Sequence, residues 1–281
     1  PISVLCDKIM PKNLYSRLLY GGIVPIGKKL VEKDLFFRSA GPSRVEKSKF
    51  SESANRALSK AEIKKIISQF GDAALRVKKA GCDGVEIHAS HGYLIQQFLS
   101  PATNKRTDEY GGSFENRARF PLECIRAIRE NMPEGMPLLM RIDAHDDYLP
   151  GGLTIEEVID FCKLAGEAGV DVLDVSRGNI LSNALKFEVP PVDLPRGFNI
   201  DNAARIRKET GMLTIGVGRI NTAEFAEKIL EEDKVDMVVM GRAQLVDPEF
   251  CNKAKAGKTE EIDYCVGCNQ GCYDGFENMD V

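Results

Sequence analysis

From Ser59 onward, short apolar runs alternate with stretches of helical periodicity, and this alternation restricts the chain to parallel α/β folds. Five of the runs have the length of a strand. They cover residues 85–87, 138–142, 172–176, 213–218 and 237–240. Because the runs are apolar throughout, rather than alternately polar and apolar, we expect strands that are covered on both faces.

The helical stretches between these runs carry recognisable ends. Ser59 with Glu62, and Thr154 with Glu157, match the capping-box pattern that begins a helix. We expect Pro121 to bend or restart one of the helices. The predicted helices cover residues 59–81, 114–132, 154–169 and 223–231, with a further helix ending at Gly211 and a proline-rich loop at 179–198.

Single strands separated by helices favour a TIM (β/α)8-type barrel over other α/β folds. A doubly wound sheet is the alternative, but no G-x-G-x-x-G turn follows any of the runs. The first fifty residues are less regular, and 2–6 and 14–20 could form strands. We expect residues 1–250 to form the barrel and 251–281 to form a separate segment with a cysteine cluster.

Composition excludes several classes of function. The net charge of −4 argues against a nucleic-acid surface. No apolar run reaches membrane-spanning length and the N-terminus lacks a leader pattern, which favours a soluble, cytoplasmic protein. Three of the eight cysteines lie close together near the C-terminus, and in a reducing compartment such a cluster indicates a metal site rather than disulfides.

The end of the 85–87 run carries the clearest candidates for catalysis. His88, His91 and Tyr93 follow it in the loop, and α/β barrels keep their chemistry at the carboxyl ends of their strands. Imidazole N–H groups stabilise a substrate oxygen that gains charge, by roughly 3–4 kcal/mol each. A phenol, with a pKa near ~10, holds a proton that it can give to a carbanion-like carbon. The alternatives are structural histidines, a metal pair without a third ligand, and a tyrosine packed on the rim.

Cationic and glycine-containing positions mark the ends of the later strands. Arg141 ends the 138–142 run, where it either faces a cofactor or forms an ion pair with Asp143 or Asp171. After the last two runs stand two Gly-Arg pairs, in the place where barrels frequently bind phosphate. Glycine lets backbone N–H groups approach an anion and arginine adds a charged fork. The pairs are Gly218-Arg219 and Gly241-Arg242.

The cysteine cluster has the spacing C-x2-C-x3-C. Its members, Cys265, Cys268 and Cys272, place three thiolates in one short loop, which suits an iron–sulfur cluster. Structural zinc is the alternative, with Cys251 as the nearest fourth ligand. In either case the site needs a ligand beyond these three.

Residues 84–119 resemble the signature of the Old Yellow Enzyme family of FMN-dependent oxidoreductases. The resemblance extends, more thinly, from about residue 14 to residue 272. The matching segments are EIH at 86–88, HGYL at 91–94, QFLSP at 97–101, TNKR at 103–106, DEYGGS at 108–113 and ENR at 115–117.

This resemblance implies an enzyme that reduces or forms an activated C=C bond of an α,β-unsaturated carbonyl, carboxylate or CoA thioester. His88 and His91 would polarise the substrate carbonyl, hydride would come from flavin N5, and the proton would come from Tyr93. FMN would be held by Arg141 beside N1 and O2 and by the two Gly-Arg pairs at its phosphate. Arg17 stands where the family usually has the Gln that binds the flavin ring.

The cysteine segment resembles the [4Fe–4S] site of the branch that contains 2,4-dienoyl-CoA reductases, 2-enoate reductases and bile-acid-inducible oxidoreductases. It implies a fourth cysteine further along and a module with FAD and NAD(P)H in cis. It also implies two barrel strands upstream, so we expect an incomplete barrel from a longer protein. The alternatives are a non-catalytic barrel fragment and a non-redox phosphate-binding barrel with structural zinc. A homo-oligomer is left open.

Overall fold

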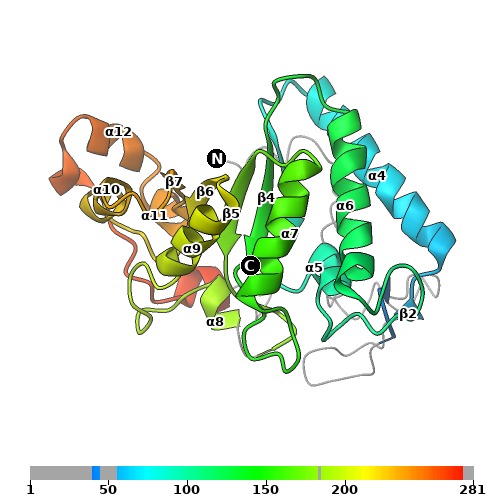
Figure 1. The fold of residues 1–281 in the computed structure, drawn as a ribbon. Helices are drawn as coiled ribbons and strands as arrows, with labels where there is room; N and C mark the ends of the chain where they lie inside the picture. The colour runs from blue at the N-terminus through cyan, green and yellow to red at the C-terminus, as the bar shows by residue number, and fades with distance from the viewer. Residues whose placement is uncertain (1–39, 45–55, 183–184, 275–281) are drawn as a thin grey trace, which may run out of the picture.

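The computed structural model describes residues 40–44, 56–182 and 185–274, and their arrangement is drawn in Figure 1. The predicted strands at 2–6 and 14–20, and the flavin-binding role predicted for Arg17, lie outside the described residues.

A parallel sheet of five strands forms the centre of the molecule. The strands are β3 (Val85–Ala89), β4 (Leu138–Asp143), β5 (Val172–Ser176), β6 (Leu213–Gly216) and β7 (Met237–Val238). Their order across the sheet is their order in the chain. A doubly wound sheet reverses its order at a switch point, whereas a barrel wall does not. The sheet therefore has the topology of part of a (β/α)8 barrel, which confirms the predicted α/β class. A short parallel pair, β1 (Ala40–Gly41) with β2 (Arg56–Ala57), lies apart from it.

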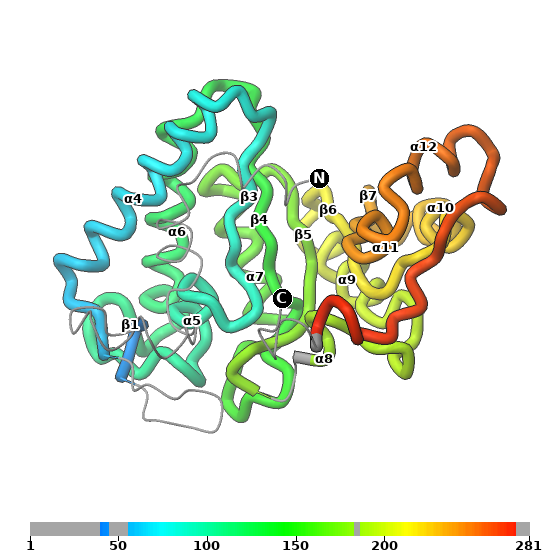
Figure 2. The backbone as a smooth tube through the Cα atoms, turned by 180° about the vertical axis from the view of Figure 1, so that it is seen from behind, coloured from blue at the N-terminus to red at the C-terminus, as the bar shows by residue number. Residues whose placement is uncertain are grey.

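Helices connect the strands. They are α4 (Lys60–Lys79), α5 (Leu94–Leu99), α6 (Phe114–Glu130), α7 (Ile155–Glu167), α8 (Leu185–Glu188), α9 (Ile200–Thr210), α10 (Ala223–Glu231), α11 (Gly241–Val246) and α12 (Phe250–Lys255), followed by a 3-10 turn at Thr259–Glu261 and a π turn at Gln270–Asp274. Helices α4, α6 and α7 lie on one side of the sheet (Figure 1). From behind, the strands β3 and β4 stand in front of α6 and α7 (Figure 2).

The two faces of the sheet differ in chemistry, although the prediction treats the runs as apolar rather than as alternately polar and apolar. Leu138 and Met140 are fully buried and Ile142 is 2 % exposed, all within the main hydrophobic core under the helices. The alternate residues Arg141 and Asp143 lie on the opposite face, because side chains alternate along a strand. The polar residues at the carboxyl half of the strands were hidden within runs that are apolar on average.

The helix ends follow the predicted caps. Ser59 with Glu62 and Thr154 with Glu157 each form both bonds of a capping box, and Gly211 ends α9 in a left-handed conformation with φ of 70°. The expected restart of the helix at Pro121 is wrong, because α6 continues through it; the alternative, a bend, stays a prediction. Burial of Pro121 and Phe120, with extensive contact between α6 and α4, outweighs the one backbone hydrogen bond that proline removes.

Four short helices, α5, α8, α11 and α12, were not predicted, because four to six residues are too few to display a helical period. Strands β6 and β7 also end earlier than the apolar runs that predicted them. Beyond β7, Ala243, Phe250 and Ile262 form a small second core. The proposed boundary at residue 250 thus falls within a packed unit, and the division into domains stays a prediction.

The aromatic pair under α6 should dominate the stability of the helical layer. Phe98 and Phe120 are fully buried with ring centroids 4.1 Å apart. Phe120→Ala is expected to lower the free energy of unfolding by about 3–5 kcal/mol, because it removes buried area and leaves a cavity. Leu245→Ala, at a side chain that is 74 % exposed, is the control and should change it by less than about 0.5 kcal/mol. Urea unfolding of both variants measures this, and equal effects would contradict the packing described.

Candidate active site

The carboxyl end of β3 brings the three predicted catalytic side chains together. The His88 ring lies 5.2 Å from the His91 ring and 4.7 Å from the Tyr93 ring, centroid to centroid, with edge-to-face orientations in both pairs. His88 belongs to β3 itself, so the prediction that the loop begins there is wrong by two residues. The strand carries one imidazole and the turn after it carries the other, and both reach the polar face of the sheet.

The turn at His91 is unusual in its backbone. His91 has φ of 60° and Gly92 has φ of 80°, so both lie in the left-handed region, which costs energy for a residue with a side chain. The His91 N–H donates to Asp143 Oδ2 at 2.6 Å. A Cβ on Gly92 would lie 2.7 Å from Asn179 Oδ1, so only glycine fits there.

A buried polar network supports this turn, and the sequence reasoning missed its centre, Asp146. The Asp146 carboxylate accepts hydrogen bonds from Gln96 Nε2 at 2.6 Å and from Ser100 Oγ at 2.5 Å. Gln96 in turn accepts from the Gly92 N–H at 2.5 Å, and Gln97 donates to the Gly92 carbonyl at 2.6 Å. Gln97 and Ser100 belong to the matching motif, but nothing in the motif points to an aspartate fifty residues later.

The two imidazoles have different surroundings. His91 Nε2 lies 2.7 Å from Ser176 Oγ and its Nδ1 lies 3.5 Å from Glu188 Oε1, so both ring nitrogens face protein groups. His88 Nδ1 accepts from the Ser90 N–H at 3.4 Å, which assigns its proton to Nε2. Within the described part of the chain, His88 Nε2 has no hydrogen-bond partner. His88 is therefore the imidazole that can donate outward.

Both histidines are held neutral. Burial lowers the pKa of His88 to about 4, and the Arg141 charge acts in the same direction. Burial also lowers the pKa of His91 well below its usual value, with further contributions from Arg141 and His88. A neutral imidazole remains a hydrogen-bond donor on one nitrogen, as the predicted role requires.

Arg141 lies beside His88 in the register of β3 and β4. Its guanidinium donates to Asp174 Oδ2 at 2.7 Å and to Ser176 Oγ at 3.2 Å, and its side chain is 25 % exposed. The ion pair considered as the alternative thus exists, but with Asp174; Asp171 pairs with Arg129 instead. Since one side of the guanidinium stays accessible, the pair does not prevent contact with a ligand.

Carboxyl groups are in excess around this single guanidinium. Burial raises the pKa values of Glu86 and Glu188 to about 7, and it also raises those of Asp143 and Asp174. One oxygen each of Asp143, Asp174 and Glu188 is buried without a hydrogen-bond partner among the residues that the structure describes. The site therefore holds exchangeable protons at neutral pH.

The two Gly-Arg pairs follow β6 and β7, which are neighbours in the sheet. Gly218 has φ of 150°, and a Cβ on Gly241 would meet no atom within 4 Å. Arg219 donates to the carbonyls of Val192 and Leu194. Arg242 donates to the Pro190 carbonyl at 2.7 Å and to Asn269 Oδ1 at 2.5 Å, which leaves other N–H groups of each fork for an anion. The structure thus brings the two pairs to one edge of the sheet, as predicted.

The cysteine segment, residues 265–272, lies against the loop at 189–194, whose carbonyls also accept from Arg219 and Arg242. Asn269 Nδ2 donates to the Val189 carbonyl, and Asn221 donates to the Cys265 carbonyl. Cys265 is half-buried, whereas Cys268 and Cys272 are exposed. Among the described residues, no three His, Cys, Asp or Glu side chains are grouped as metal ligands. The metal site predicted at the three thiols therefore stays a prediction.

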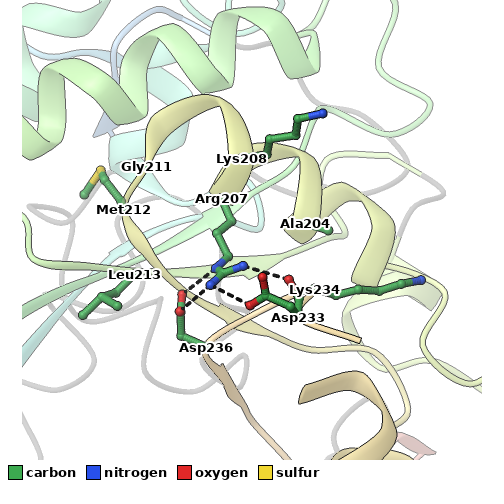
Figure 3. A pocket seen from close by; sticks show the side chains of 9 residues that line it. All are labelled: Ala204, Arg207, Lys208, Gly211, Met212, Leu213, Asp233, Lys234 and Asp236. Carbon is green, nitrogen blue, oxygen red and sulfur yellow. Dashed lines mark hydrogen bonds and ion pairs between the residues drawn. The ribbon is translucent and has the colours of Figure 1, made fainter. Parts of the chain in front are cut away.

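A cavity of about 550 Å³ lies at the other end of the strands (Figure 3). It is lined by residues at the amino-terminal ends of β6 and β7, among them Gly211, Leu213 and Lys234. At its centre Arg207 makes two hydrogen bonds with Asp236, at 2.9 and 3.0 Å (Figure 3). The amino-terminal end of barrel strands serves stability rather than chemistry, so we assign it no function.

The fold and this cluster of imidazole, phenol and guanidinium groups are typical of α/β-barrel enzymes, which keep their chemistry at the carboxyl ends of the strands. Residues 22–261 match the model of the NADH:flavin oxidoreductase / NADH oxidase family. The chain belongs to this family, which confirms the resemblance to Old Yellow Enzymes; the iron–sulfur branch stays a prediction.

Comparisons with individual proteins support membership of the same family. The NADH oxidase of Thermoanaerobacter brockii is 46 % identical over 226 residues, which are 80 % of this chain and 34 % of the relative. A complex of 2-naphthoyl-CoA reductase with 2-naphthoyl-CoA superposes with a TM-score of 0.78 and 32 % identity, over 85 % of this chain and 36 % of that one. The structure of morphinone reductase with tetrahydroNAD superposes with a TM-score of 0.63 and 27 % identity, over 81 % of this chain and 61 % of that one. The chain thus spans about a third of the length of the first two proteins. In its described part, no helix is both long and apolar enough for a membrane span.

The buried Glu86 should make stability depend on pH. Because its folded pKa is raised from 4.5 to about 7, its contribution is complete below about pH 4.5 and is lost as the pH rises through 7. Glu86→Gln should abolish this loss, so the variant should gain up to roughly 3 kcal/mol over the wild type between about pH 5 and about pH 8. Urea unfolding at both pH values measures it. The exposed Glu227→Gln is the control, and an unchanged pH dependence in Glu86→Gln would contradict the assignment.

Proposed function

We propose that this chain is the FMN-binding barrel of an NAD(P)H-dependent oxidoreductase that reduces, or in the reverse direction forms, an activated C=C bond. The supporting observation is the contact of His88, His91 and Tyr93 beside Arg141 on the polar face of the sheet. These groups supply an oxygen-directed donor, a proton donor and a fixed positive charge within one site. Bound FMN would supply the hydride that such a reaction needs.

His88 polarises the substrate in this proposal. Its Nε2–H is the outward donor, so it would bind the carbonyl or carboxylate oxygen next to the double bond and stabilise the charge that develops there. His91 supports His88 from its edge and is itself held by Ser176 and Glu188. We therefore revise the predicted symmetrical pair into one donor and one supporting residue.

Tyr93 delivers the proton. Its ring packs on His88, so the phenol and the Nε2–H belong to one binding position. A phenol keeps its proton at neutral pH and can release it to a carbon that becomes basic as hydride is added to the neighbouring carbon. A general acid of this kind contributes about 10²–10⁴-fold in rate.

The residues present fit a flavin in its two polar regions. The accessible side of Arg141 provides a cation for the ring edge at N1 and O2, where a reduced ring is anionic. Gly218, Arg219, Gly241 and Arg242 provide free backbone and guanidinium N–H groups for the phosphate. Arg17, outside the described residues, remains proposed as a contact to the ring.

For the substrate we propose a planar, conjugated enone, enoate or CoA thioester. The relatives named above point to this class through 2-naphthoyl-CoA and morphinone reductase. The reductant would be NADH or NADPH, through an FAD-containing module in cis, and the setting would be the cytoplasm.

The [4Fe–4S] cluster remains part of the proposal on the strength of the C-x2-C-x3-C spacing alone. Because the three thiols in the described structure do not converge, ligation would require the segment from Cys265 to Cys272 to rearrange. No step of the proposed reaction within the barrel depends on it.

Tyr93→Phe tests the proton donor. We expect alkene reduction by the reduced protein to slow by about 10²–10⁴-fold, whereas reduction of the flavin by dithionite keeps its rate. Stopped-flow absorbance separates the two half-reactions. Tyr264→Phe, at a tyrosine bonded to the Thr259 carbonyl, is the control. If both half-reactions of Tyr93→Phe match the wild type, another group is the acid.

Metal analysis tests the cysteine segment against structural zinc. After anaerobic purification we expect iron and acid-labile sulfide, with both lost in Cys268→Ser and retained in Cys251→Ser. Zinc that disappears in both variants would instead support the zinc site with Cys251 as a ligand.

A further inference from the structure

Glu188 is a half-buried acid that the proposed reaction does not use. It ends α8, which is fixed by its neighbour Phe187: this ring stacks between Tyr148 and Phe198, with centroids 5.8 Å from each. The Arg177 guanidinium lies 4.3 Å from the Phe187 ring centroid. These contacts hold α8 against the loop that follows β5.

The Glu188 carboxyl faces the His91 ring. Its Oε1 lies 3.5 Å from His91 Nδ1, and its Oε2 is buried and has no hydrogen-bond partner in the described ranges of the chain. On the far side of the ring, His91 Nε2 lies 2.7 Å from Ser176 Oγ, which also accepts from Arg141 Nη2 at 3.2 Å. Glu188, His91, Ser176 and Arg141 thus form one line of polar contacts.

The two ends of the His91 ring are chemically linked, because a neutral imidazole carries its proton on one nitrogen only. If Glu188 is protonated, it donates to Nδ1, and the His91 proton lies on Nε2, directed at Ser176. If Glu188 is ionised, it accepts from Nδ1–H, and Nε2 accepts from the Ser176 hydroxyl. Ser176 can serve in both states, since a hydroxyl donates once and accepts twice.

We propose that Glu188 is a positioning residue whose protonation state selects the tautomer of His91 and, with it, the direction of the hydrogen bond between His91 and Ser176. In one state the protons lie on the Glu188 carboxyl, on His91 Nε2 and on Ser176 Oγ; in the other state they lie on His91 Nδ1 and on Ser176 Oγ. In net terms, the site loses one proton when the pH rises.

The surrounding charges allow this switch near neutrality. Glu188 is faced by His91 from the turn after β3 and by Arg141 and Asp143 from β4, and Asp174 on β5 neutralises Arg141. Burial raises the pKa of Glu188 to about 7 and Arg141 opposes that shift. Lys186, on α8 itself, is directed to the Tyr148 and Phe187 rings.

The consequence for catalysis rests on the proposed function, because it matters only if Arg141 faces a flavin. In that case the partner of Arg141, Ser176, changes its hydrogen bonding with pH: it accepts from Arg141 in both states, but its hydroxyl proton is directed at His91 Nε2 only when Glu188 is ionised. The tautomer itself can be measured without a flavin, so the two ideas can fail separately.

The test is nitrogen NMR of the chain labelled with ¹⁵N in its histidine rings. The chain has three histidines, so His91 can be assigned by its loss in His91→Gln. Between about pH 5.5 and about pH 8.5 the two His91 ring nitrogens should exchange their protonated and unprotonated shifts, with a midpoint near 7. Glu188→Gln should show a single tautomer over the whole range, because its amide does not titrate.

Glu86→Gln is the matched control. It removes another half-buried carboxyl whose pKa is about 7 and which interacts with Arg141, but it makes no contact with His91. The exchange of shifts should therefore persist in this variant. Persistence of the exchange in Glu188→Gln would assign the switch to Asp143, 3.4 Å from Nε2, and overturn the proposal. A wild type with one tautomer at every pH would overturn it as well.

Discussion

The register of three parallel strands determines the candidate site. His88 on β3 lies beside Arg141 on β4, and Arg141 lies beside Asp174 on β5. A slip of one residue in β4 would turn Arg141 into the helix-side core and bring Met140 or Ile142 to the polar face. The fully buried Leu138 and Met140 prevent this, because a charged guanidinium in their place would lose its solvent and its partners. The apolar core thus specifies the polar site on the other side of the same strands.

The polar face carries more negative groups than one arginine can neutralise. Such an arrangement is unfavourable for folding unless some carboxyls keep their protons. Burial favours the protonated form here, because it raises the pKa values of Glu86, Asp174 and Glu188. Strongly shifted groups that gather at the carboxyl ends of barrel strands are typical of functional sites. The left-handed backbone at His91 is a second energetically unfavourable feature at the same place. Hydrogen bonds to Asp143 and within the Asp146 network stabilise it.

Much of the architecture could be predicted from the sequence, because capping boxes and apolar runs are local signals. Ser59 and Thr154 begin helices as expected, and the strand at Val172–Ser176 has the predicted bounds. His88, His91 and Tyr93 could be named because they lie within a dense motif. Glu188 and Asp146 could not, since each acts through a contact with the 91–96 segment that depends on the packing of distant loops. Similarly, the ion pair of Arg141 with Asp174 could not be predicted, because the two residues are neighbours only through the pairing of β4 with β5.

The central claim is that a flavin lies against the polar face with its ring edge at Arg141. The most direct measurement is a titration of the chain with FMN, followed by the quenching of flavin fluorescence, in the wild type and in Arg141→Gln. We expect saturable binding in the wild type, with affinity reduced by about tenfold or more when the charge is removed, since an ion-type hydrogen bond contributes roughly 1.5–3 kcal/mol. Binding that is equally tight in both proteins, or absent from both, would be inconsistent with this position of the flavin.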